Sequence, residues 1–134
     1  MGRKVVSGQE AETLLKLLWK IEEGYAPSEE EKAYLEDITG MDFIWKVIEQ
    51  LPESLGKCKN LQSLDLRSTK ITELPEWLGK CKNLQELYLS DTKITELPES
   101  LGECKKLQSL HLRFTQITEL PESLGECKIY KVWI

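Results

Sequence analysis

One pattern, LxxLxLxxTxIxELPxxLGxC, recurs along residues 51–134 of this chain. Counted from each Leu-Pro pair, complete copies occupy residues 51–73, 74–96 and 97–119, and a truncated fourth copy occupies 120–134. A fixed period of about 20 to 29 residues is typical of solenoids, in which each copy packs against its neighbours. The repeat therefore restricts the chain to a stack of equivalent turns.

Each copy contains a short strand followed by a return segment. In Leu64-Asp65-Leu66, alternation directs the two leucines inward and Asp65 outward, and strands of neighbouring copies are expected to stack in parallel. The Leu-Pro-Glu step begins the return, because proline suits an extended or helix-opening position. A glycine recurs at one point of every copy, which indicates a tight turn or close packing. These glycines are Gly56, Gly79, Gly102 and Gly125.

The N-terminal region predicts two helices. Apolar residues at helical spacing indicate an amphipathic helix over 7–24, with Ser7 and Glu10 as a capping box and Gly24 at its end. A second helix opens at Ser28, where Glu31 completes another box, and is expected to reach about residue 36.

A degenerate first copy follows these helices. Its apolar residues Ile38, Met41, Phe43 and Ile48 stand where Leu61, Leu64, Leu66 and Ile71 stand later. Terminal repeats are commonly atypical because they cover an exposed core edge. We therefore expect one continuous domain, with residues 1–37 as an N-terminal helical cap and residues 38–134 as repeats.

At these residues the sequence resembles the leucine-rich repeat family. The Thr, the following Ile and the Leu-Pro-Glu-Ser-Leu-Gly segment are most similar to repeats of plant intracellular immune receptors, and bacterial and Ras-suppressor-type repeats share the Leu-Pro step. The resemblance implies an α/β solenoid, a short curved horseshoe with a parallel sheet on its concave face. It also implies a hydrogen-bond ladder at Thr69, Thr92 and Thr115 and recognition of a protein or peptide by the concave face.

Differences between the copies indicate where a partner would bind. Eight of the 23 positions vary among the three complete copies, and five of these lie on the outward face of the strand or just beyond it. Large side chains with a polar group are frequent interface anchors. The candidate partner-binding residues on the concave face are Trp45, Asp65, Arg67, Tyr88, Asp91, His111, Arg113 and Phe114. Mixed polar and aromatic residues also occur on exposed strands for solubility and cross-strand pairing alone.

The truncated last copy provides a second candidate surface. Aligned with the other copies, Tyr130 and Trp133 take inward positions, while Val132 and Ile134 fall outward. A final strand that is apolar on both faces is prone to association. One hypothesis is a homodimer formed through Ile129, Val132, Trp133 and Ile134. The alternative is that the aromatic tail folds back as a minimal cap in a monomer.

Four cysteines recur at the 23-residue spacing, at positions 58, 81, 104 and 127. This spacing places them in one column as equivalent core side chains, which favours a role as small buried hydrophobes. No Cys-x-x-Cys pair is present, so the pattern argues against a zinc site. A disulfide between adjacent turns stays open as an alternative and would imply an oxidising compartment.

Composition and motifs argue against several other functions. The net charge of −5 arises within residues 1–50, and no part of the chain offers the basic surface that nucleic acids select. Membrane binding is equally unfavoured, because no apolar run approaches the about 20 residues of a membrane span. His111 is the only histidine and lies two strands from Asp65, so we expect no enzyme and no cofactor. A cytoplasmic protein is expected, although a mature secreted form stays open.

Overall fold

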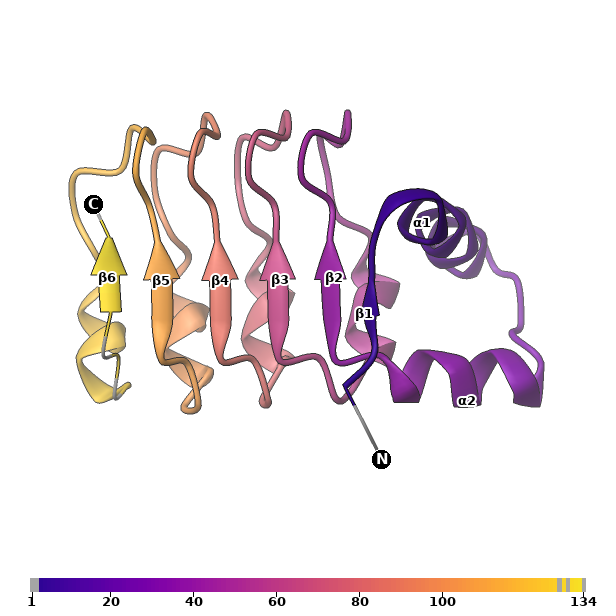
Figure 1. The fold of residues 1–134 in the computed structure, drawn as a ribbon. Coiled ribbons are helices and arrows are strands. Elements are labelled where there is room, and N and C mark those ends of the chain that lie inside the picture. The colour runs from indigo at the N-terminus through magenta and orange to yellow at the C-terminus, as the bar shows by residue number, and fades with distance from the viewer. Residues whose placement is uncertain (1–2, 128, 130, 134) are drawn as a thin grey trace.

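The computed structural model describes residues 3–127, 129 and 131–133. Its main element is a six-stranded parallel sheet in which the strands follow chain order (Figure 1). The strands are β1 (Val5–Val6), β2 (Gly40–Asp42), β3 (Ser63–Asp65), β4 (Glu86–Tyr88), β5 (Ser109–His111) and β6 (Lys131–Trp133). Each return segment contains a 3-10 helix that starts after the repeat's proline: η1 (Glu53–Lys57), η2 (Glu76–Lys80), η3 (Glu99–Glu103) and η4 (Glu122–Glu126). The short α/β solenoid expected from the repeat is confirmed.

Two helices cover the N-terminal end of the solenoid, α1 (Gly8–Glu22) and α2 (Glu29–Asp37) (Figure 1). The capping box of α2 is confirmed, since Ser28 and Glu31 exchange both predicted hydrogen bonds. The box of α1 was wrongly predicted. Ser7 occupies the N-cap position without a side-chain bond, and the Glu10 carboxylate instead accepts a hydrogen bond from the Tyr34 hydroxyl of α2. Glu10 therefore joins the two cap helices.

The degenerate first copy has the register of the later copies. Gly40, Met41 and Asp42 of β2 pair with Ser63, Leu64 and Asp65 of β3, and Met41 and Phe43 are buried. The sequence did not indicate β1, whose two valines extend the sheet beyond β2. Val6 is fully buried, so the cap closes the core with a strand as well as with helices.

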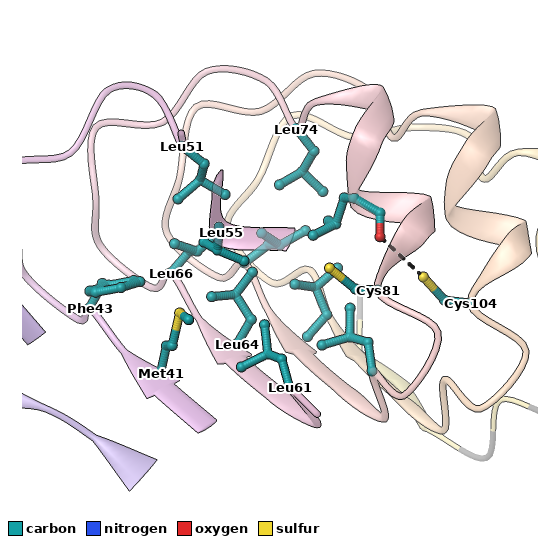
Figure 2. Close-up of a cluster of buried hydrophobic side chains, with 14 of the residues drawn as sticks. Met41, Phe43, Leu51, Leu55, Leu61, Leu64, Leu66, Leu74, Cys81 and Cys104 are labelled. Atoms are coloured by element: carbon teal, nitrogen blue, oxygen red, sulfur yellow. Dashed lines mark hydrogen bonds between the residues drawn. The ribbon is translucent and has the colours of Figure 1, made fainter. Parts of the chain in front are cut away.

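The core consists of the inward leucines and isoleucines stacked turn upon turn (Figure 2). The cysteine column belongs to this core, as predicted: all four cysteines are buried, and the thiol of Cys104 donates to the carbonyl of Leu78 at 3.5 Å. The described residues contain no disulfide. Burial raises the pKa of the thiol to about 12 at Cys58 and to about 11 at Cys81, because the surroundings disfavour the thiolate.

A serine column links the return segments. The hydroxyl of Ser100 donates to the carbonyl of Glu76, and Ser123 donates to Glu99, each at 2.7 Å. Ser54 of the first turn instead donates to the carbonyl of Leu18 in α1 at 2.6 Å, which attaches the cap to the repeats. Trp77 occupies this column in the second turn and has no hydroxyl to donate.

Trp77 also alters the packing of the recurring glycines. A methyl group placed on Gly79 would lie 2.4 Å from the backbone oxygen of Ser100, and one on Gly102 would lie 2.4 Å from Cβ of Ser123. Next to Trp77, a methyl group on Gly56 would meet no atom within 4 Å. Close packing of the glycine column is therefore confirmed where serine is the neighbour and absent where tryptophan replaces it.

The predicted row of hydrogen bonds at the threonine position is present, with each bond lying within one turn. The hydroxyls of Thr69, Thr92 and Thr115 each donate at 2.7 Å to the carbonyl three residues earlier in their own turn. These hydroxyls consequently stabilise the corner of each turn.

The last strand is shifted by one residue from its predicted alignment. Val132 pairs with the inward Leu110, and Trp133 pairs with His111, so the predicted alignment of this strand and the predicted outward facing of Val132 are wrong. The backbone already differs at Cys127, whose ψ of 143° is extended, whereas Cys58, Cys81 and Cys104 have ψ between 74° and 78°. A one-residue shift exchanges the two faces of a strand.

Candidate functional site

The candidate site is the face of the sheet that points away from the core, hereafter the sheet face. Its central column is formed by Asp42, Asp65, Tyr88 and His111, which are successive register partners on β2 to β5. Asp65, Tyr88 and His111, which the sequence places on the outward face, are thus confirmed as neighbours on adjacent strands. Adjacent strands bring these side chains within about 5 Å of one another along the column.

An aromatic stack occupies the middle of the column. The rings of Tyr88 and His111 lie 4.4 Å apart at an angle of 20°, and the guanidinium of Arg67 lies over the other side of Tyr88 at 5.3 Å. The Tyr88 hydroxyl donates to Glu86 at 2.7 Å, and Ser109 lies 2.8 Å from Nε2 of His111. Partial burial and the bond to Glu86 raise the pKa of Tyr88 to about 12, so its hydroxyl stays protonated at neutral pH. Each of the two stacked rings therefore has a hydrogen-bond partner on its own strand.

Asp65 and Arg67 form the strongest ion pair of the face. The guanidinium donates to both carboxylate oxygens, with its shortest contact at 2.6 Å, and the Asp65 side chain is only 10% exposed. The hydrogen bonds to Asp65 raise the pKa of Arg67. Because a bidentate pair has one preferred geometry, Asp65 fixes the guanidinium that lies over Tyr88.

A second row of residues lies at the corner where each strand ends, and we call it the rim row. It consists of Trp45, Ser68, Asp91 and Phe114, and all four have left-handed backbone conformation with φ between 58° and 68°. The aromatic side chains at its two ends are 74% exposed at Trp45 and 78% at Phe114. The sequence predicts these two aromatics as partner contacts but does not indicate their backbone conformation, because neither glycine nor asparagine marks the corner.

The charges of the two rows are unequally compensated. Four carboxylates accept hydrogen bonds within the chain: Asp42 from the Ile44 amide, Asp65 from Arg67, Glu86 from Tyr88 and Asp91 from Ser68. Arg113 forms no ion pair among the described residues, and its guanidinium lies 5.4 Å from the Phe114 ring centre. Asp42, Glu86 and Asp91 keep their negative charge, because their donors are neutral, and Arg113 is a cation of this face without a carboxylate partner among the described residues.

The face offers little for catalysis or metal binding. The described residues contain no group of three or more His, Cys, Asp or Glu side chains that could hold a metal ion. His111 contacts Ser109 and Tyr88, and Asp65 lies two strands away, as the sequence predicted. No helix in the described part of the chain is long and apolar enough to cross a membrane.

The predicted self-association residues are only partly described. Ile129 is partly buried against the core, and Val132 is 38% exposed at the free edge of β6. Leu120 nearby is also 38% exposed, although the equivalent Leu74 and Leu97 are 6% exposed. Ile134 and the side chain of Trp133 lie outside the described residues.

Comparison with known proteins agrees with this architecture. Residues 59–117 match a family model described as leucine rich repeat. No protein with a curated description matches the sequence significantly.

Solved structures of similar shape come from several organisms. A leucine-rich repeat protein of Leptospira interrogans is 29% identical with a TM-score of 0.66, and the match covers 78% of this chain and 28% of that chain. An internalin of Listeria monocytogenes shares the fold at 23% identity and a TM-score of 0.72, over 92% of this chain and 35% of that chain. A structure of the Drosophila Toll–Spatzle complex matches at 22% identity and a TM-score of 0.66, over 73% of this chain and 14% of that chain. This chain thus spans less than half the length of each.

Proposed function

Since this chain folds as a solenoid of leucine-rich repeats, we propose that it is a binding module that recognises a protein or peptide through its sheet face. The observation that carries the proposal is the stack of Arg67, Tyr88 and His111, because it presents large polar-aromatic side chains in a fixed arrangement. Groups that are already ordered lose little conformational entropy on binding, which favours affinity.

Two further observations support this proposal. Five of the eight positions that vary among the copies lie on the sheet face or just beyond it, three lie in the return segments, and the inward leucines are constant. A solenoid with constant framework and varied outward side chains separates stability from recognition. The Toll–Spatzle structure describes a protein complex, which agrees with a protein-binding role for a similar fold.

The test is capture of partners by the immobilised chain from an extract of the organism that encodes it. Tyr88→Ala combined with His111→Ala removes the stack and should abolish capture of the specific partner. Lys82→Ala with Glu103→Ala is the matched control, because it removes another interacting pair, joined at 3.4 Å on the return side. A partner that is retained by the first variant and lost by the second would contradict the proposal.

A second candidate is self-association through the β6 edge. Exposed Leu120 and Val132 favour it, because they place apolar side chains beside a strand edge that no described segment covers. Light scattering at high micromolar concentration should then show a dimer that Val132→Lys dissociates. A wild-type monomer under these conditions would exclude this candidate.

A further inference from the structure

We propose that the rim row binds an extended peptide segment of a partner through two apolar side chains about four residues apart, with an acidic side chain beside the one that contacts Phe114. This inference rests on the proposed function, because it assigns the partner's chemistry to one part of the binding face. Trp45 and Phe114 supply the two apolar contacts, and Arg113 supplies the charged one.

The spacing of the aromatic side chains follows from the backbone. Hydrogen bonds continue beyond the strands into the rim row: the amides of Trp45, Ser68 and Asp91 donate to the carbonyls of Arg67, Ser90 and Arg113 at 3.2, 3.1 and 2.9 Å. The corners therefore repeat at the strand spacing, which places Trp45 and Phe114 about 14 Å apart across three intervals. Residues i and i+4 of an extended chain span about 13 to 14 Å and point to the same side.

A helical partner fits this spacing less well. Residues on one face of a helix recur at i+7 and i+11, which correspond to rises of about 10 and 16 Å. Neither agrees with the separation of the two corners. An extended segment that crosses the corners of the turns is the better match.

The aromatic residues have no structural role that explains them. Bulky residues rarely adopt positive φ, and both side chains are about three-quarters exposed, so neither contributes much to the core. The two middle turns carry Ser68 and Asp91 at this corner, joined by a 2.8 Å hydrogen bond. Strain that persists with exposed apolar surface is characteristic of a binding position.

The basic residues beside the two aromatic side chains indicate which end of the proposed segment carries the acidic side chain. Arg113 lies beside Phe114 without an ion pair among the described residues, whereas Lys46 beside Trp45 is bound to Glu12 at 3.1 Å. The cation beside Phe114 is therefore unpaired among the described residues, whereas the cation beside Trp45 is paired. A carboxylate of the segment would complete the vacant pairing of Arg113.

The experiment is selection of binders from a displayed library of short linear peptides on the immobilised chain. We expect enriched peptides to carry an apolar pair at i and i+4 with an acidic neighbour. Trp45→Ser and Phe114→Ser should each weaken their binding about tenfold or more, the effect of losing one anchor. Serine occupies this corner natively at Ser68, so both variants should fold.

Trp77→Ser is the matched control, because it also replaces a tryptophan by the residue of the other copies, but on the return side, and it should leave peptide binding unchanged. The inference is overturned by the absence of enrichment, by apolar pairs at i+7 or i+11, or by peptides that bind the Trp45→Ser and Phe114→Ser variants normally. Partner capture from the extract distinguishes the two proposals. A partner lost with Tyr88→Ala and His111→Ala but retained by the rim variants would support the proposed function and refute the rim inference.

Discussion

Alanine substitutions at Gly56 and Gly79 should have opposite effects on stability, although both residues occupy the same position of the repeat. At Gly79 the new methyl group would lie 2.4 Å from the backbone oxygen of Ser100, so two turns must separate. At Gly56 it would meet nothing within 4 Å. The reduced entropy of the unfolded chain stabilises both variants by about 0.4 to 1 kcal/mol, so the difference between them is the packing term.

Overpacking of this kind costs about 1 to 3 kcal/mol. Gly56→Ala should therefore raise the free energy of unfolding slightly, and Gly79→Ala should lower it by about 1 to 2 kcal/mol. Urea unfolding followed by circular dichroism measures both, and the midpoints should differ by about 1 M. Equal shifts in the same direction would refute the reasoning.

A double variant tests whether Trp77 is the cause. If Trp77 holds η1 and η2 apart, Trp77→Ser lets these helices approach as η2 and η3 do. Gly56→Ala should then become destabilising in the Trp77→Ser background. A coupling energy near zero between the two substitutions would show that Trp77 does not set this spacing.

Three further predictions concern the core, the cap and the rim. Because burial raises the thiol pKa of Cys58 to about 12 and of Cys81 to about 11, from an ordinary value of 9.0, both should resist a thiol reagent at pH 8. These thiols ionise at a lower pH in the unfolded chain than in the folded chain, so the free energy of unfolding should fall as pH rises from about 9 towards 12. The fall should be less steep in Cys58→Ala, and a free energy of unfolding that does not change over this pH range would contradict the prediction. Ser54→Ala should lower the free energy of unfolding by about 0.5 to 1.5 kcal/mol in urea titrations, because the hydrogen bond from the Ser54 hydroxyl to the Leu18 carbonyl is lost, and an unchanged midpoint would refute this role. Phe114→Gly should leave the free energy of unfolding, measured by thermal denaturation, unchanged or raise it by up to about 1 kcal/mol. Glycine adopts positive φ without strain, and this gain outweighs the lost contact of the ring with Arg113. A clear loss of stability would show that the ring has a structural role.

Sequence periodicity was sufficient for most of the fold because it depends on local alternation. The inward leucines, the outward column from Asp42 to His111 and the α2 capping box were all correctly predicted, since each follows from residue types at fixed spacing. The Ser7 box failed because Glu10 has a competing donor in Tyr34, which lies 24 residues away.

The candidate site was predictable as a set of positions but not as an arrangement. Alternation placed Tyr88 and His111 on one face, yet their stacking and the position of Arg67 over Tyr88 depend on side-chain torsions that no spacing encodes. The unpaired cation of Arg113 was equally hidden, because spacing does not show which carboxylate each cation reaches: Asp65 binds Arg67, and no described carboxylate forms an ion pair with Arg113.

The sequence by itself determined the solenoid, its repeat length and the residues that face outward, because a 23-residue period forces equivalent side chains into columns. Only the tertiary structure decided where that periodicity breaks. β6 is shifted by one residue after an extended Cys127, a methyl group on Gly56 would meet no neighbour whereas one on Gly79 would meet Ser100, and Trp45 and Phe114 have positive φ and exposed rings. These features arise from contacts and torsions between turns, and a repeat pattern specifies only what successive turns have in common.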